Sequence, residues 1–138
     1  MSVPVLLDTC AAIWLMNGDR LSANSRVAIG AAQVEHLGVH VSPITAWEIA
    51  TLAAKGRLQL TLSPDAWFDR VLSISGVRLT VLSPKILIAS ATLPGTPPRD
   101  PADRIIAATA RALGYSVVTR DGELTQYGAA GHIEVIGC

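Results

Sequence analysis

The sequence predicts an α/β domain of three layers, with helices on both faces of a mostly parallel central sheet. Short apolar runs typical of buried strands alternate along the chain with segments of helical periodicity, and Ser-Pro pairs open several of the expected helices. A chain of 138 residues also has the length of one domain with a substantial core, so residues 1–138 are expected to form a single unit.

The expected elements alternate from one end of the chain to the other. Residues 93–99 carry three prolines and a glycine, so they are expected to form a loop. Strands are expected at residues 4–8, 39–42, 77–82, 116–119 and 133–136. Helices are expected at residues 9–16, 22–33, 42–55 and 63–72, from residue 83 onward, and at 101–113.

The composition limits how this protein can bind its partners. Half of the residues are hydrophobic and the mean hydropathy is +0.41, which predicts that a partner covers some apolar surface. The 11 basic and 11 acidic residues cancel. Since proteins that hold nucleic acid by overall charge are basic, any nucleic-acid role must rest on a small local patch.

The chain lacks the features of an exported or membrane-embedded protein. Charged residues, Pro or Gly interrupt each apolar run before it reaches the roughly 20 residues of a membrane-spanning helix. No basic segment followed by an apolar core and a cleavage site opens the sequence. Cys10 and Cys138 are too few and too isolated for a disulfide framework or a thiolate metal site. A cytoplasmic location without membrane contact is the resulting expectation.

Acidic side chains recur where the expected strands end. Asp8 directly follows an apolar strand, Asp121 follows the strand at 116–119, and Asp103 lies in the first turn of an apolar helix that Asp100 can cap. Glu48 lies about one and a half turns beyond the strand that ends at Ser42. Because ligands of open α/β sheets bind at the carboxyl ends of the strands, these acids are expected to lie close together.

Each acid also has a structural explanation. Asp100 and Asp103 are typical of a helix start, and Asp121 before a glycine is typical of a turn. Glu48 aligns with Thr45 at helical spacing and so fits an exposed polar stripe. Asp8 is harder to explain in this way, because an unused charge at the edge of the core is costly to desolvate.

As a group, the acids predict a divalent metal site. Two carboxylates about 5 Å apart repel by about 3 kcal/mol at an effective dielectric near 20, so such a cluster needs retained protons or a cation. Ligands that are all oxygen select Mg²⁺, or Mn²⁺ in its place. A metal-activated water is a nucleophile for a phosphodiester. The predicted catalytic residues are Asp8, Glu48, Asp103 and Asp121, with Asp8, Asp103 and Asp121 as metal ligands and Asp8 and Asp103 as the principal ones.

Neighbouring polar residues have supporting roles in this prediction. The hydroxyls of Thr9 and Thr119 adjoin metal acids and can bond a carboxylate or a metal water, and Asp100 lies beside the site. Arginines next to the acids can position an RNA backbone, although salt bridges would explain them equally well. The arginines are Arg99, Arg104 and Arg120.

Four segments resemble the PIN-domain ribonucleases of the VapC toxin type, and the likeness spans nearly the whole chain. They are Leu7-Asp8-Thr9, residues 42–49, residues 100–110, and Val118-Thr119-Arg120-Asp121. The resemblance implies a metal-dependent endoribonuclease, the toxin of a type II toxin–antitoxin pair, inhibited by a VapB-type antitoxin that wraps it and covers the acidic site. It also implies a homodimer. Asp8, Glu48 and Asp103 match the main acids of the family, and Asp121 matches its fourth.

Two alternatives stay open. The near-neutral charge and apolar composition also fit a PIN-like domain that binds RNA or a protein without catalysis. A phosphatase-like or receiver-like domain fits poorly, because Asp8 has no acid beside it or two residues later.

Overall fold

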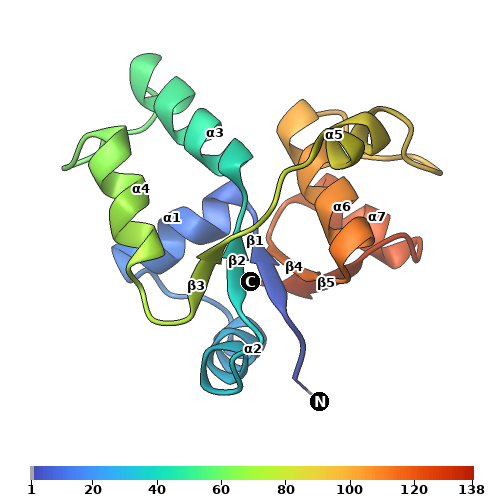
Figure 1. The fold of residues 1–138 in the computed structure, drawn as a ribbon, viewed down its shortest axis with the longest axis horizontal. Coiled ribbons are helices and arrows are strands. Elements are labelled where there is room, and N and C mark those ends of the chain that lie inside the picture. Colours follow the sequence, from blue (N-terminus) through green and yellow to red (C-terminus); the bar gives the residue numbers. More distant parts are fainter. Residues whose placement is uncertain (1) are drawn as a thin grey trace.

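A five-stranded sheet in the order β3-β2-β1-β4-β5 forms the centre of the computed structural model, which describes residues 2–138 (Figure 1). The strands are β1 (Val5–Leu7), β2 (Val39–Val41), β3 (Val77–Leu79), β4 (Ser116–Thr119) and β5 (Glu134–Gly137). The helices are α1 (Thr9–Asn17), α2 (Ala23–Val34), α3 (Pro43–Ala54), α4 (Pro64–Leu72), α5 (Pro84–Ala91), α6 (Pro101–Leu113) and α7 (Gly122–Ala129).

All neighbouring strands are parallel, and β1 lies in the middle. Val5 of β1 pairs with Val39 of β2 on one side and with Ser116 of β4 on the other. The chain therefore moves outward in one direction from β1 to β2 and β3, and in the opposite direction through β4 and β5. The direction reverses between β1 and β4, and open α/β sheets bind ligands at the carboxyl ends of the strands beside such a reversal.

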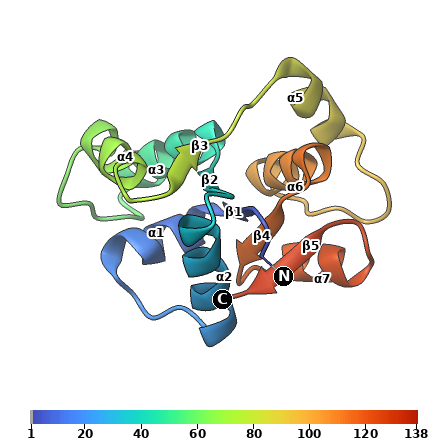
Figure 2. The same cartoon turned by 60° about the horizontal axis from the view of Figure 1, so that its bottom comes forward.

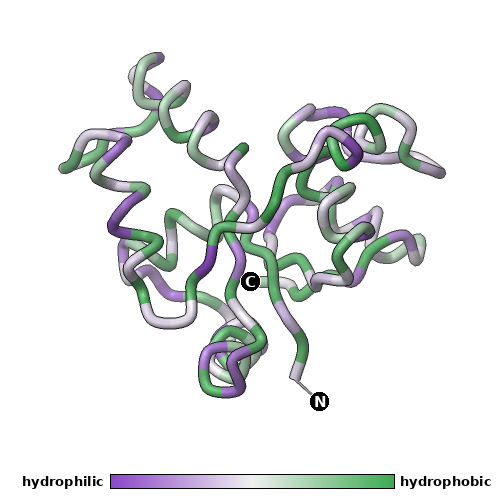
Figure 3. The backbone as a smooth tube through the Cα atoms, viewed as in Figure 1, coloured by the Kyte–Doolittle hydropathy of each residue, from purple (hydrophilic) through white to green (hydrophobic). Residues whose placement is uncertain are grey.

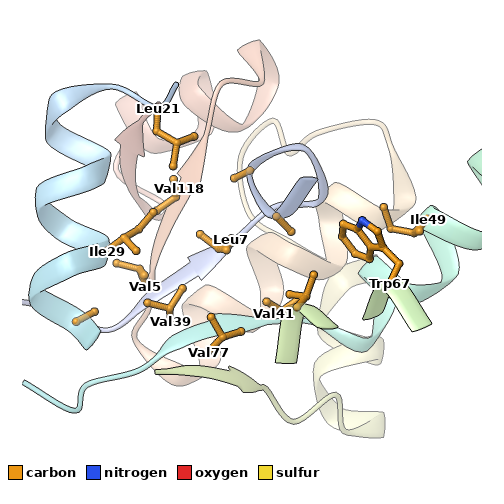
Figure 4. Close-up of a cluster of buried hydrophobic side chains, with 14 residues drawn as sticks. Val5, Leu7, Leu21, Ile29, Val39, Val41, Ile49, Trp67, Val77 and Val118 are labelled. Atoms are coloured by element: carbon orange, nitrogen blue, oxygen red, sulfur yellow. The ribbon is translucent and has the colours of Figure 1, made fainter. Parts of the chain in front are cut away.

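Alternate residues of the strands face two different helix layers. Val5 and Leu7 belong to one buried cluster with residues of α1 and α2, together with Ile49 and Trp67 from α3 and α4 (Figure 4). Leu6 points the other way, into a cluster with α6 and α7. Figure 2 shows α1 and α2 on one side of the sheet and α5 and α6 on the other. The predicted three-layer class is thus confirmed.

Hydroxyl and carboxyl side chains fix where the helices begin. Asp8, Asp100 and Asp121 cap α1, α6 and α7, and each accepts a hydrogen bond from a backbone amide of the first turn. Serines before proline cap α3, α4 and α5 in the same way. The caps at Asp8, Ser42 and Asp121 directly follow β1, β2 and β4, so α1, α3 and α7 begin at the carboxyl edge of the sheet.

Two parts of the sequence prediction are wrong. The strand expected at 77–82 ends at Leu79, because its partner β2 stops at Val41 and only Thr80 still donates its amide to Val41. The helix α7 is absent from the prediction, because its sequence contains glycines and no long apolar run. Its start is nevertheless marked by the Asp121 cap. Within residues 2–138, none of the helices combines the length and apolarity that a membrane crossing needs.

Candidate active site

Asp8 is the most buried acid at the carboxyl edge, with 4% of its surface exposed. Its Oδ1 atom accepts a hydrogen bond from the Ala11 amide at 2.8 Å, and its Oδ2 atom accepts one from the Thr119 hydroxyl at 2.5 Å. Burial raises the pKa of Asp8 above its usual range, although both hydrogen bonds act to lower it. The carboxylate is therefore held in one orientation and desolvated.

Thr119 connects two of the acids. It is fully buried at the end of β4, and its hydroxyl donates to Asp8 while accepting the Asp121 amide at 2.9 Å. Asp121 in turn accepts the Leu124 amide at 2.9 Å through Oδ2 and so caps α7. One hydroxyl thus links the acids that follow β1 and β4, and the supporting role of Thr119 at a metal site stays a prediction.

Asp103 is half-buried in the first turn of α6 and is held less firmly than Asp8. Asp100 accepts the Asp103 amide at 3.1 Å, but within residues 2–138 no group donates a hydrogen bond to the Asp103 carboxyl group. The two acids therefore do not form a reciprocal capping pair. Burial, and then the charges of the neighbouring acids, raises the pKa of Asp103 to about 8. Those neighbours are Asp100, Asp121, Glu48 and Asp8.

Glu48 reaches the same edge from α3. It is half-buried, and one of its carboxylate oxygens accepts a hydrogen bond from the Thr9 hydroxyl. Burial raises the pKa of Glu48, with further contributions from Asp100 and Asp8. Thr45, one turn earlier, is completely buried, so these residues do not form an exposed polar stripe.

The donor set fits a hard divalent cation. Every acid gathered here offers oxygen atoms only, and within residues 2–138 no cationic side chain lowers the pKa of Asp103. Within residues 2–138, no three Asp, Glu, His or Cys side chains are arranged to hold one ion together. At most two acids can therefore reach an ion directly in this arrangement, with water completing its shell. That is the coordination that Mg²⁺ ordinarily takes in proteins.

The three arginines expected to contact RNA all have partners within the chain. Arg120 lies over the Trp14 ring at 3.9 Å and donates to the Cys138 carbonyl at 2.7 Å. Arg104 is half-buried and donates to the backbone carbonyls of residues 98 and 90. Arg99 pairs with Glu123 at 3.3 Å, but 90% of its side chain is exposed. Of the three, Arg99 is therefore the best placed to meet a ligand.

Two further residues lie beside the acids. Cys10 is exposed, but partial burial and the charges of the nearby acids raise its pKa to about 11, so its thiol stays protonated and is a poor nucleophile. Thr45 is not among the predicted site residues, yet its hydroxyl lies 3.1 Å from that of Thr9. Its spacing of three residues from Glu48 is visible in the sequence, where it fits an exposed face.

Comparisons with known proteins identify the family. The model of the PIN domain matches residues 5–130 of the chain. Ribonuclease VapC22 of Mycobacterium tuberculosis is 33% identical over 125 residues, which cover 89% of this chain and 91% of that protein.

Solved structures share the fold. The crystal structure of VapBC2 from Rickettsia felis, bound to a promoter DNA fragment, contains a chain with a TM-score of 0.68 and 14% identity, covering 98% of both chains. DNA-bound VapBC from Salmonella typhimurium gives a TM-score of 0.65 and 22% identity, covering 99% of this chain and 98% of the other. As its sequence motifs predict, the chain belongs to the PIN-domain family and is related to a VapC ribonuclease over nearly all of its length.

Proposed function

We propose that this protein is a Mg²⁺- or Mn²⁺-dependent endoribonuclease that acts in the cytoplasm as the toxin of a type II toxin–antitoxin pair. The observation that carries the proposal is the gathering of Asp8, Glu48, Asp103 and Asp121 at one edge of the sheet, where burial and the charges of the other acids raise the pKa of Asp103 to about 8. A site of this kind is costly without a cation and suited to one. The relative named as a ribonuclease supports the choice of RNA as substrate.

In this proposal each acid has a role that follows from how its side chain is held. Asp8 and Asp103 would be the principal metal ligands, and Asp121 would contact the ion through a coordinated water. Glu48, which α3 brings to the same edge, would orient the attacking water and accept its proton. When bound, the cation lowers the pKa of a coordinated water and neutralises charge on the phosphate oxygens.

We propose that protein partners cover exposed apolar side chains of this domain. Leu79, Val81 and Ile88 are 50%, 66% and 70% exposed, and Figure 3 shows hydrophobic colour running from β3 into the segment before α5. Trp47, beside Glu48, is 60% exposed. The named relatives of known structure are VapBC complexes, which supports a VapB-type antitoxin as one partner. A second copy of this chain, forming a homodimer, is the other partner that we propose.

The decisive experiment measures RNA cleavage by protein purified free of any partner, with a chelator or with Mg²⁺ or Mn²⁺. We expect cleavage only with the divalent ion. Asp8→Asn should lower it by more than about 100-fold, beyond the 10- to 100-fold effect typical of losing an outer-shell partner. Asp69→Asn, which changes an exposed acid of α4, is the matched control and should cleave like the wild type. A folded Asp8→Asn variant that cleaves like the control would refute the assignment.

The second candidate is a PIN-like domain that binds RNA or a protein without cleaving it. Two observations favour it: no three acids are arranged to hold one ion within residues 2–138, and the three arginines near the site all have intramolecular contacts. It predicts no cleavage after long incubation and no rise in melting temperature when the divalent ion is added. Both results together would replace the nuclease proposal with this one.

A further inference from the structure

Thr45 is a buried polar residue next to the proposed site that the nuclease proposal does not use. It lies in the first turn of α3, three residues before Glu48, and none of its surface is exposed. Within residues 2–138, its hydroxyl has one hydrogen-bond partner, the Thr9 hydroxyl at 3.1 Å. A buried hydroxyl with a single partner in another helix is a specific contact, because leaving either group unpaired costs free energy.

The direction of this hydrogen bond follows from the number of protons. A threonine hydroxyl has one proton to donate and two lone pairs that can accept. Thr9 donates its proton to a carboxylate oxygen of Glu48, so towards Thr45 the Thr9 oxygen can only accept. The chain therefore runs from the Thr45 hydroxyl to the Thr9 hydroxyl and ends on the Glu48 carboxylate.

Both ends of this chain matter for the geometry of the site. Thr9 immediately follows Asp8 and opens α1, whereas Glu48 lies on α3 and is only half-buried. A long acidic side chain with one fixed oxygen has far fewer orientations available than a free one. Its other oxygen, Oε2, has no hydrogen bond within residues 2–138 and remains available to a ligand.

We propose that Thr45 is a positioning residue for Glu48, acting through the Thr9 hydroxyl to hold one oxygen of that carboxylate in place. The inference rests on the proposed nuclease function, because it assigns Glu48 a part in the reaction. A purely structural role would be to join α1 to α3, and the two roles differ in what removal of the hydroxyl does to the reaction rate.

The test compares Thr45→Val, which keeps the shape and removes the hydroxyl, with Thr45→Ser, which keeps the hydroxyl. The readouts are kcat and KM for a fluorophore–quencher RNA oligonucleotide of mixed sequence at saturating Mg²⁺, with the melting temperature measured in parallel. We expect Thr45→Val to lower kcat about three- to tenfold, as loss of one hydrogen bond of ordinary strength would, with little change in KM. Thr45→Ser should have a kcat close to that of the wild type.

Thr109 provides the matched control. It is also completely buried, and its hydroxyl donates to the Ile105 carbonyl at 2.7 Å within α6. Thr109→Val therefore removes a buried hydroxyl from the same residue type without touching Glu48, and kcat should stay at the wild-type value. If Thr45→Val does not fold, Thr45→Ala removes the same hydroxyl with less steric demand and takes its place.

The outcomes separate the two proposals. Absence of divalent-dependent cleavage by the wild type would refute the nuclease proposal, and the role of Thr45 would fall with it. Cleavage by the wild type together with an unchanged kcat in Thr45→Val would overturn the positioning role alone. The positioning role would also be overturned if Thr45→Ser loses as much kcat as Thr45→Val, or if Thr109→Val does.

Discussion

The two sides of the acidic site are built differently. On the side of β1 and β4, Asp8 is almost fully buried and both of its oxygens accept hydrogen bonds, one of them from Thr119. On the side of α6, Asp103 is half-buried and no group within residues 2–138 donates to its carboxyl. The first carboxylate is held by the protein, whereas the second depends on its electrostatic surroundings.

This difference shows which part of the site tolerates the absence of a cation. Hydrogen bonds from Ala11 and Thr119 partly offset the desolvation of Asp8. Asp103 has no such compensation, and burial and four like charges raise its pKa to about 8. The β1–β4 side is therefore preorganised, and the α6 side is the part that a bound cation should stabilise most.

Removing the Thr119 hydroxyl is expected to weaken the preorganised side in both stability and cleavage. Thr119→Val leaves an Asp8 oxygen and the Asp121 amide without their shared partner. We expect unfolding free energy to fall by about 1–3 kcal/mol. Cleavage should fall about 10- to 100-fold, as for other outer-shell partners. Thr119→Ser keeps the hydroxyl and should retain most of the unfolding free energy and most of the cleavage activity. Chemical denaturation and RNA cleavage measure the two effects, and equal behaviour of the two variants would contradict the assigned role.

The α6 side should respond to pH instead. In the unfolded chain Asp103 ionises with the ordinary aspartate pKa of 3.8, whereas the folded protein keeps the proton until its pKa of about 8. The folded state therefore binds more protons between these values, so the stability that this group contributes is fully present below pH 3.8, falls progressively as pH rises, and is completely lost once pH exceeds about 8. The melting temperature of the metal-free protein should fall between about pH 7 and about pH 9, a window above the titration of ordinary histidines.

Two comparisons test whether Asp103 causes this fall of the melting temperature with pH. Asp103→Asn cannot ionise, so its melting temperature in chelator should change less between the two pH values and exceed that of the wild type at the higher one. Asp69→Asn should keep the wild-type slope, because Asp69 is exposed on α4. Saturating Mg²⁺ should reduce or reverse the loss in the wild type, since the ion binds the ionised acids. An identical slope in wild type and Asp103→Asn would show that another group titrates.

Much of this architecture could be predicted from local sequence. Ser-Pro pairs, apolar strands and capping acids predict the element order and bring Asp8, Glu48 and Asp121 to one edge, because the strands before α1, α3 and α7 all end there. Asp103 lies on α6, which follows α5 and a loop rather than a strand, so its place at this edge does not follow from strand direction. The length of β3 could not be predicted, because it depends on where its partner β2 stops. The helix α7 escapes prediction because its burial comes from tertiary packing of Leu124 and Tyr127 rather than from a periodic apolar run.

Side-chain partners were the least predictable part of the site. Thr119 and Asp8 are 111 residues apart in the chain, so no local pattern reveals that one donates to the other. The polar spacing of Thr45 and Glu48 is ambiguous, since an exposed helix face and a buried hydrogen-bond chain share the same periodicity. The arginines illustrate the same point, because sequence position puts them near the acids but does not reveal their contacts.

The smallest expected effects are those of removing the arginines, and they differ between Arg120 on the β4 side and Arg99 before α6. Arg120, on the β4 side, stacks on Trp14 and donates to a backbone carbonyl, so Arg120→Ala should lower unfolding free energy by about 1 kcal/mol. Arg99 is exposed, and surface ion pairs contribute little, so Arg99→Ala should change stability by less than about 1 kcal/mol. If Arg99 contacts the RNA backbone, its removal should raise KM and reduce the salt dependence of binding.

Glu123→Gln provides the control that makes this contrast specific. It weakens the ion pair with Arg99 but leaves the guanidinium in place, so KM should not rise. A higher KM in Glu123→Gln as well as in Arg99→Ala would mean that the pair orders the loop before α6 rather than that Arg99 meets RNA. A higher KM in Arg120→Ala at unchanged stability would reverse the comparison. Arg120, on the β4 side, would then contact the substrate instead of Arg99.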